Sequence, residues 1–469
     1  MSVNKTPGVY IQEITKLPPS VAEVETAIPA FIGYTQKAVG LNGEVLKNVP
    51  TRIVSFLEYE KFFGGPDPEA LSIEIQDTID PAVGSTTIIN RVVRAIQPTS
   101  FNPSSLYYQM QLYFSNGGGP CYIVSVGAYI ATQLKADFEA GINALEQFDE
   151  PTLICFPEAF ENLTETNYGS LLVTALAQCN KLKDRFVIAD VPANKVSLFR
   201  DKAGMNNLKY GAAYYPFLNS NLSIGYIESS VTITIHQKTK GNTTTDSDLK
   251  GKAMNHADVD QPLKDAIRGA LASIYVTELA PSGAIAGVYA SVDNDRGVWK
   301  APANVTLNNV SSLTVTIDDG IQDGLNVDPV AGKSINAIRT FMGKGIMVWG
   351  ARTLAGNDNE WRYVPVRRFF NFVEESCQKS TGWAVFEPND ANTWLRVKAQ
   401  LENFLNNLWR RGALAGAKPE HAYYVSIGLG STMTAQDILE GRMIVEIGMA
   451  AVRPAEFIIL KFSHMLQQS

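Results

Sequence analysis

Side chains that could perform catalysis or bind a metal are few in this chain of 469 residues, and they lie far apart. The histidines are His236, His256, His421 and His464, and the cysteines are Cys121, Cys155, Cys179 and Cys377. No HxxxH, HExxH or CxxC pattern occurs, so no two of these residues have the spacing that places two ligands on one metal ion. We expect isolated histidines, reduced and buried thiols, and no metal site.

Two short glycine-containing segments resemble sites for phosphate or acyl chemistry but lack an essential residue. A phosphate-binding loop needs a glycine five residues before Gly332, in the GKS run that ends at Ser334, and Val327 stands there instead. The sequence GLGS at 428–431 lacks the final glycine of the turn that presents a serine nucleophile. We therefore predict no catalytic residue and no cofactor.

The composition excludes several classes of protein. Lys and Arg number 40 against 47 Asp and Glu, and a formal net charge of −7 disfavours a general nucleic-acid binder. Hydrophobic residues make up 45%, which disfavours disorder, and no apolar run approaches the ~18 residues of a membrane span. Charged residues make up only 19%, below the usual ~25%, so we expect other protein to cover part of the surface.

The charge is unevenly distributed along the chain. From Ile335 to Ser469, 15 Lys and Arg oppose 12 Asp and Glu, a net +3, whereas the preceding residues carry a net −10. Such asymmetry indicates that the two parts face different surroundings. The first twenty residues lack the apolar run of a secretory signal, so we expect a protein assembled in the cytoplasm.

The secondary-structure elements predicted for the first half of the chain follow an α/β pattern. Short apolar segments such as Cys121–Val126 and Phe186–Val191 alternate with helical periodicity across 105–217, which predicts a parallel sheet flanked by helices. Residues 66–104 are rich in Pro, Ser, Thr and Asp, and we expect them to be irregular.

The second half combines β-rich segments with long helices. We expect a hairpin within 219–260, and a similar β-rich decoration of the outer surface at 305–334. Apolar periodicity predicts helices at Val364–Ser380 and Thr393–Arg411, and Trp383–Phe386 is expected to form a short strand.

A β-prone segment lies near each end of the chain without a neighbouring segment to pair with. An isolated strand must add to a sheet elsewhere in this chain or in another. The residues predicted to form such strands are Val9, Tyr10, Ile11, Ile14, Phe457, Ile458, Ile459, Leu460 and Phe462. For the first segment, an ordinary first strand of the same domain is the alternative.

Several segments, taken in order, carry a family resemblance. They are TPGVYIQEI and AIPAFIGY near the start, GAIAGVYASVDNDRGVWKAPAN (283–304), SINAIRTFMGKGIMVWGARTL (334–354), FEPNDANTWLRVKAQLENFLNNLWRRGAL (386–414) and MTAQDILEGRMIVEIGMAAVRPAEFIILKF (433–462). Together they make the chain similar to contractile tail sheath proteins, the family found in phage tails, R-type pyocins and extracellular contractile injection systems. The similarity is looser through 105–217 and is lost at 219–260 and 305–330.

The resemblance implies a structural role without enzymatic activity. Family members stack as hexameric rings around an inner tube, and the sheath contracts to drive the tube through a target cell envelope. The implied partners are further copies of the chain, the inner tube protein, baseplate and tail-terminator or cap proteins, and paralogous sheath proteins, with no nucleic acid and no membrane insertion. The implied locations are the bacterial cytoplasm during assembly, then a phage tail or a released or anchored injection particle.

The resemblance also implies a mixed α/β architecture, in which an inner domain is built from both ends of the chain. The expected parts are an N-terminal arm (1–26), the first part of the sheath body (27–104), an inserted α/β domain (105–217), an outer β-rich region (218–334) with a linker at 283–304, a C-terminal domain that faces the tube (335–454), and a C-terminal arm (455–469). The arms are expected to add strands to sheets of neighbouring subunits.

Within the C-terminal domain, we predict that the helix Thr393–Arg411 contacts the tube. Its polar residues are Arg396, Lys398, Glu402, Arg410 and Arg411. The net +3 of the last third would suit an acidic tube exterior, and a merely solvated polar face is the alternative. Two other classes of protein stay open: an α/β enzyme, favoured only by 105–217, and another self-assembling shell, such as a capsid or surface layer.

Overall fold

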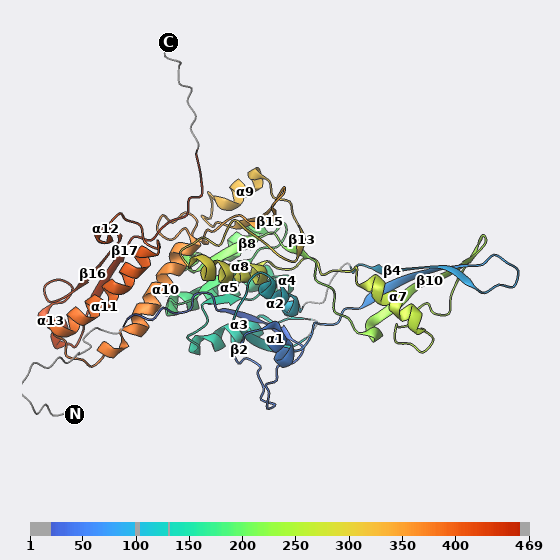
Figure 1. Ribbon diagram of the computed structural model, residues 1–469, viewed down its shortest axis with the longest axis horizontal. Helices are drawn as coiled ribbons and strands as arrows, with labels where there is room; N and C mark the ends of the chain where they lie inside the picture. The colour runs from blue at the N-terminus through green and yellow to red at the C-terminus, as the bar shows by residue number, and fades with distance from the viewer. Residues whose placement is uncertain (1–19, 99–103, 130–131, 460–469) are drawn as a thin grey trace, which may run out of the picture. The chain divides into compact units, whose positions relative to one another are not determined.

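The computed structural model describes residues 20–98, 104–129 and 132–459, which divide into two compact units (Figure 1). Of the described residues, the large unit holds those from Glu25 to Phe372 and from Arg453 onward, and the small unit holds those up to Val24 and from Val373 to Val452.

The large unit contains a sheet that, over the described residues, has nine strands in the order β12-β15-β14-β8-β7-β6-β1-β5-β2. Their bounds are β1 (Pro29–Thr35), β2 (Thr51–Ile53), β5 (Cys121–Ala128), β6 (Leu153–Cys155), β7 (Phe186–Asp190), β8 (Gly211–Tyr215), β12 (Val305–Thr306), β14 (Asn336–Phe341) and β15 (Gly345–Val348). The strands from β14 through β5 run parallel, and β2, β15 and β12 are antiparallel to their neighbours. The predicted parallel sheet is confirmed, and it also takes strands from before and after 105–217.

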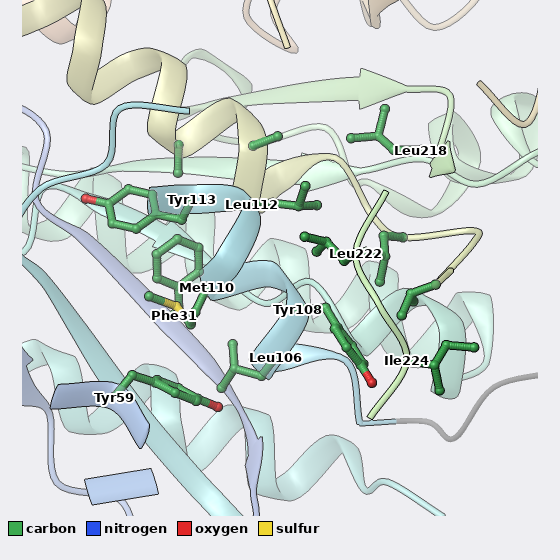
Figure 2. Packing of buried hydrophobic residues seen from close by; sticks show 14 of the residues in the cluster. Phe31, Tyr59, Leu106, Tyr108, Met110, Leu112, Tyr113, Leu218, Leu222 and Ile224 are labelled. Atoms are coloured by element: carbon green, nitrogen blue, oxygen red, sulfur yellow. The ribbon is translucent and has the colours of Figure 1, made fainter. Parts of the chain in front are cut away.

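Helices cover both faces of this sheet, which explains why its central strands are apolar throughout. On one face, Phe31 of β1 belongs to a cluster with residues of α2 (Leu106–Ser115) and α8 (Ser282–Arg296). Figure 2 shows Phe31 beside Tyr113 of α2, with ring centroids 5.1 Å apart. On the other face, residues of β1 pack with α3 (Lys135–Ala144) and α5 (Glu165–Leu182). This unit also contains α1 (Phe56–Phe63), α4 (Ala159–Asn162), α6 (Val196–Lys202), α7 (Gln261–Leu271), α9 (Asp319–Asn326) and the start of α10 (Val364–Ser380).

A second sheet in the large unit has the strand order β11-β10-β3-β4 within the described residues. Its strands are β3 (Leu71–Ile79), β4 (Ile88–Ile96), β10 (Val231–Lys240) and β11 (Thr243–Asp246), and α7 packs against β4. The predicted hairpin within 219–260 is confirmed as β10 and β11. The prediction that 66–104 is irregular is wrong, because Leu71, Ile73 and Ile75 alternate with polar residues and bury one face of β3.

The segments 283–304 and 305–334 differ from expectation. Residues 283–304, predicted to be a linker, begin as the buried helix α8, where a side chain at Gly287 would come within 2.5 Å of the Tyr113 carbonyl oxygen. In 305–334, β12 joins the edge of the nine-stranded sheet and β13 (Val310–Leu313) pairs with β9 (Leu218–Ser220). Further along that segment, Asp319–Asn326 form α9, and the Asp318 side chain caps this helix by accepting a hydrogen bond from the Ile321 N–H. The segment is therefore only partly β-structure.

The small unit is mostly helical. It contains the end of α10 (Val364–Ser380), α11 (Ala391–Arg410), α12 (Pro419–Ala422) and α13 (Ala435–Leu439), together with strands β16 (Tyr423–Ile427) and β17 (Val445–Met449). Both predicted long helices are confirmed. The strand predicted at Trp383–Phe386 is wrong: Gly382–Ala384 forms a 3₁₀ turn, and the Trp383 indole donates to Gln400 of α11 at 2.8 Å.

Candidate assembly surfaces

The sheet of the small unit has only two strands within the described residues, and both outer edges lack a further strand. β16 and β17 pair in antiparallel register from Tyr423 opposite Met449 to Ile427 opposite Val445. A two-stranded sheet is marginally stable alone, and its unpaired N–H and C=O groups can accept another strand. Here α11 packs against β16 and supports the sheet from one side (Figure 1).

The two faces of this small sheet differ in how they are covered. Val425 is buried, but Val445, Ile447 and Met449 of β17 are only half-buried. On the opposite face, the Tyr424 ring lies over Gly448, where a side chain would overlap the ring. The small sheet is therefore apolar beside α11 and only partly covered at β17.

The predicted tube-contact residues of α11 lie at different places around the helix. Residues two apart on a helix do not face the same direction, so Arg396 and Lys398 border opposite sides of the exposed face. The Arg396 guanidinium stacks on the Trp383 ring, 4.2 Å from its centroid, and Lys398 lies 3.7 Å from the carboxylate of Glu402.

The end of α11 carries the other two arginines of this prediction. Arg410 is exposed, and Arg411 is exposed and forms an ion pair with Glu23. The five predicted residues are thus all at least partly accessible, but they do not form one continuous charged cluster.

The described N-terminal segment lies extended along the end of α10. The N–H groups of Ala22 and Val24 donate to the hydroxyls of Ser380 and Ser376, at 3.0 and 3.2 Å. The two hydrogen bonds can form together because two residues of extended chain and one turn of helix each span about 6 Å. The strand residues predicted before this point, Val9, Tyr10, Ile11 and Ile14, lie outside the described residues.

The C-terminal segment presents an apolar surface. Phe457, Ile458 and Ile459 are 72, 81 and 80% exposed, and they form no strand within the described residues. The predicted strand Glu456–Phe462 is therefore not formed over its described part, because no partner strand adjoins it. Leu460 and Phe462 lie outside the described residues.

The run that ends at Ser334, considered above for phosphate binding, has a structural role. The N–H groups of Ala331 and Lys333, which a phosphate would need, donate to the Asp328 carboxylate at 3.1 and 3.4 Å. Within the described residues no three His, Cys, Asp or Glu side chains gather as a metal site. In the same part of the chain, no helix has the length and apolar character to cross a membrane.

Comparisons with known proteins agree with this arrangement. Residues 356–463 match the family model described as the phage tail sheath C-terminal domain. The structure resembles the helical sheath of the anti-feeding prophage in its contracted state, with a TM-score of 0.65 and 32% sequence identity over 98% of this chain and 99% of that one.

The chain belongs to the contractile tail sheath family.

Other relatives extend the comparison. The sheath complex of an extracellular contractile injection system, PVC, in its contracted state has a TM-score of 0.63 and 30% identity over 99% of this chain and 98% of that one. A tail sheath protein of Vibrio phage KVP40 is 26% identical over 139 residues, and a prophage major tail sheath protein of Pseudomonas aeruginosa is 25% identical over 181 residues. These matches span 20% and 44% of the two curated sheath proteins, so less than half of either is covered.

The sequence of this sheath protein predicts a strand near each end of the chain, but it does not point to the β16–β17 sheet as a surface for strand addition. In the sequence, β16 and β17 are visible only as two short β-prone runs with a helical segment between them. The sequence gives no sign that these runs pair with each other, or that the described part of the chain adds no third strand to them.

Proposed function

We propose that this chain polymerises as stacked hexameric rings around an inner tube and contracts to drive the tube through a target cell envelope. The arms of each subunit add strands to the β16–β17 sheet of neighbouring subunits. The observation that carries this proposal is the incomplete two-stranded sheet in a chain whose C-terminal segment exposes Phe457, Ile458 and Ile459.

Strand addition would use groups that are now unpaired. Each backbone hydrogen bond contributes about 0.5–1.5 kcal/mol, so one added strand of five or six residues is a modest contact. Because each subunit would hold several neighbours, later contacts form at high effective concentration and the assembly becomes strong. Such arms also allow subunits to rotate as rigid bodies without dissociating, as contraction requires.

The surface of α11 that carries Arg396, Lys398, Glu402, Arg410 and Arg411 is proposed to face the tube. Support comes from the accessibility of all five residues and from the net +3 of the last third of the chain. A weakly charged contact suits this role, because the sheath must slide relative to the tube during contraction.

The proposed partners are further copies of this chain, the inner tube protein, baseplate and terminator or cap proteins, and paralogous sheath subunits. Assembly would take place in the bacterial cytoplasm. The finished particle would be a phage tail or an extracellular contractile injection system, which is the setting of the PVC relative.

Electron microscopy of the purified chain, with and without residues 1–17, tests this proposal. The full chain should form ridged hollow cylinders, and the shortened chain should stay folded but form none, because it lacks one donor strand. A circular dichroism spectrum and a melting temperature close to those of the full chain are the control for folding. Long cylinders from the shortened chain would contradict strand exchange, and closed polyhedra or flat lattices from the full chain would indicate a different kind of shell.

A further inference from the structure

Glu456, the residue that precedes the exposed Phe457–Ile459, is held by several groups of the large unit. Its carboxylate accepts hydrogen bonds from Arg352 Nε at 2.9 Å and Nη2 at 2.5 Å, from Asn326 Nδ2 at 3.0 Å and from the Tyr363 hydroxyl at 3.2 Å. These donors come from the end of α9 and from the segment between β15 and α10. The chain is thus fixed at one residue and exposed at the next.

Arg352 is itself rigidly placed. Its backbone N–H and C=O both bond to the Asn336 side chain of β14, at 2.7 and 2.8 Å, and its Nη1 donates to the Asn326 carbonyl at 3.1 Å. Gly350 leaves room for this arrangement, because a side chain there would come within 2.8 Å of the Asn336 amide oxygen. The guanidinium therefore has a defined position on the nine-stranded sheet before it meets the C-terminal segment.

Burial of Arg352 makes the Arg352–Glu456 pair sensitive to the loss of the Glu456 charge. The Arg352 side chain is 5% exposed and the Glu456 side chain 22% exposed. Removing the Glu456 carboxylate would leave the buried Arg352 guanidinium as an uncompensated charge, which costs more than such a pair gains. Burial alone would raise the pKa of Glu456, but the hydrogen bonds from Arg352 and Asn326 outweigh it and lower this pKa, so the carboxylate is ionised at neutral pH.

We propose that Arg352 and Glu456 are positioning residues that fix where, and in which register, the C-terminal arm leaves the subunit. The proposal rests on the proposed strand exchange and deepens it. A slip of one residue in a strand turns every side chain to the other face, so a donated strand must start from a fixed point. Fixing its first residue also reduces the ordering that binding must impose on the arm.

The test compares the full chain with Glu456→Ala, Glu456→Gln and, as a matched control, Glu420→Ala, which removes an exposed acid of α12. The first readout is the mobility of a nitroxide spin label attached at Ile459→Cys in unassembled subunits, measured by electron paramagnetic resonance; the native cysteines are buried, so the label goes to the exposed position. Glu456→Ala should narrow the spectral lines of the label, because the segment loses its attachment to Arg352, and Glu456→Gln, which keeps the shape and loses the charge, should narrow them less. Glu420→Ala should leave them unchanged.

The second readout is the yield and helical geometry of assembled cylinders. Glu456→Ala should lower the yield at least about fivefold, or broaden the rise and twist of the cylinders that form, while amide hydrogen exchange in the nine-stranded sheet stays as in the unmodified chain. Unchanged mobility of the label at position 459 would overturn the proposal whether or not cylinders form. Cylinders of unchanged yield and geometry from Glu456→Ala would overturn it as well.

The proposed function can fail separately from this inference. If the unmodified chain forms no cylinders, polymerisation is contradicted, and the mobility of the spin label still decides whether Glu456 holds the arm. Should Glu456→Ala fail to fold, Glu456→Gln supplies both readouts.

Discussion

Glu158 is a fully buried acid that lies just beyond β6, at the edge of the parallel sheet where α/β enzymes bind their ligands. Its carboxylate accepts the N–H of Leu106 at 2.7 Å and that of Tyr34 at 3.0 Å. Leu106 begins α2, and the N-terminus of a helix is where a bound anion would lie. Burial raises the pKa of Glu158 to about 8, although these hydrogen bonds oppose the shift. The protein's own side chain occupies this position, which argues against the α/β enzyme considered from the sequence.

Two glycines in helices lead to opposite predictions for the same substitution. In α8, Gly287→Ala would place a methyl group 2.5 Å from the Tyr113 carbonyl oxygen, which forces α8 and α2 apart. Overpacking of this kind costs about 1–3 kcal/mol, so the melting temperature should fall. In α7, nothing lies within 4 Å of the added methyl group at Gly269, so Gly269→Ala should stabilise by about 0.5–1 kcal/mol.

Thermal and urea unfolding of the two variants beside the unmodified chain measures this difference. Equal effects of both substitutions, or a stable Gly287→Ala variant, would contradict the close packing of α8 on α2.

At the residue scale, local interactions could be predicted from the sequence and distant ones could not. Thr434 and Asp437 are three residues apart, the spacing of a capping box, and they form one at the start of α13. Arg352 and Glu456 are separated by 104 residues, so only the tertiary structure brings them together. Nothing in the sequence near Glu158 distinguishes it from an exposed acid.

At the scale of elements, α11 is the best place to test the contact with the tube. Lys398→Glu breaks a half-exposed i,i+4 pair with Glu402, which costs only about 0.5 kcal/mol, so the helix should still fold. If α11 meets an acidic tube, the reversed charge should weaken co-assembly with tube protein by about tenfold. Arg396→Glu probes the other side of the exposed face of α11.

Co-sedimentation of sheath subunits with preformed tubes measures the effect, with Lys418→Glu as a control that reverses an exposed charge outside α11. If both α11 variants bind tubes as the control does, the face of α11 is merely solvated.

Elements with a strong apolar period were predictable, and short or isolated ones were not. The stripe of Val397, Leu401 and Leu408 identified α11, and these residues are buried in the structure. β3 and β4 were missed because the Pro- and Ser-rich composition around them masked the alternation of apolar residues. Trp383–Phe386 has strand-like residues, but a strand forms only where a partner adjoins it.

At the scale of the whole molecule, the family resemblance and the composition predicted more about function than local sequence patterns did. The family was predicted from several segments that follow one another along the chain in the order typical of that family, and the comparisons confirm the family. The domain boundaries drawn from the sequence and the strands before Ser20 and after Ile459 stay predictions. They depend on contacts between subunits, and one chain contains only half of each such contact.

Helical reconstruction of assembled sheaths from the purified chain tests strand exchange most directly. The account predicts that the β16–β17 sheet gains strands from neighbouring copies, one from the segment around Val9–Ile14 and one from the segment that follows Glu456. A reconstruction in which β16 and β17 remain two-stranded, with both arms packed on their own subunit, would contradict it.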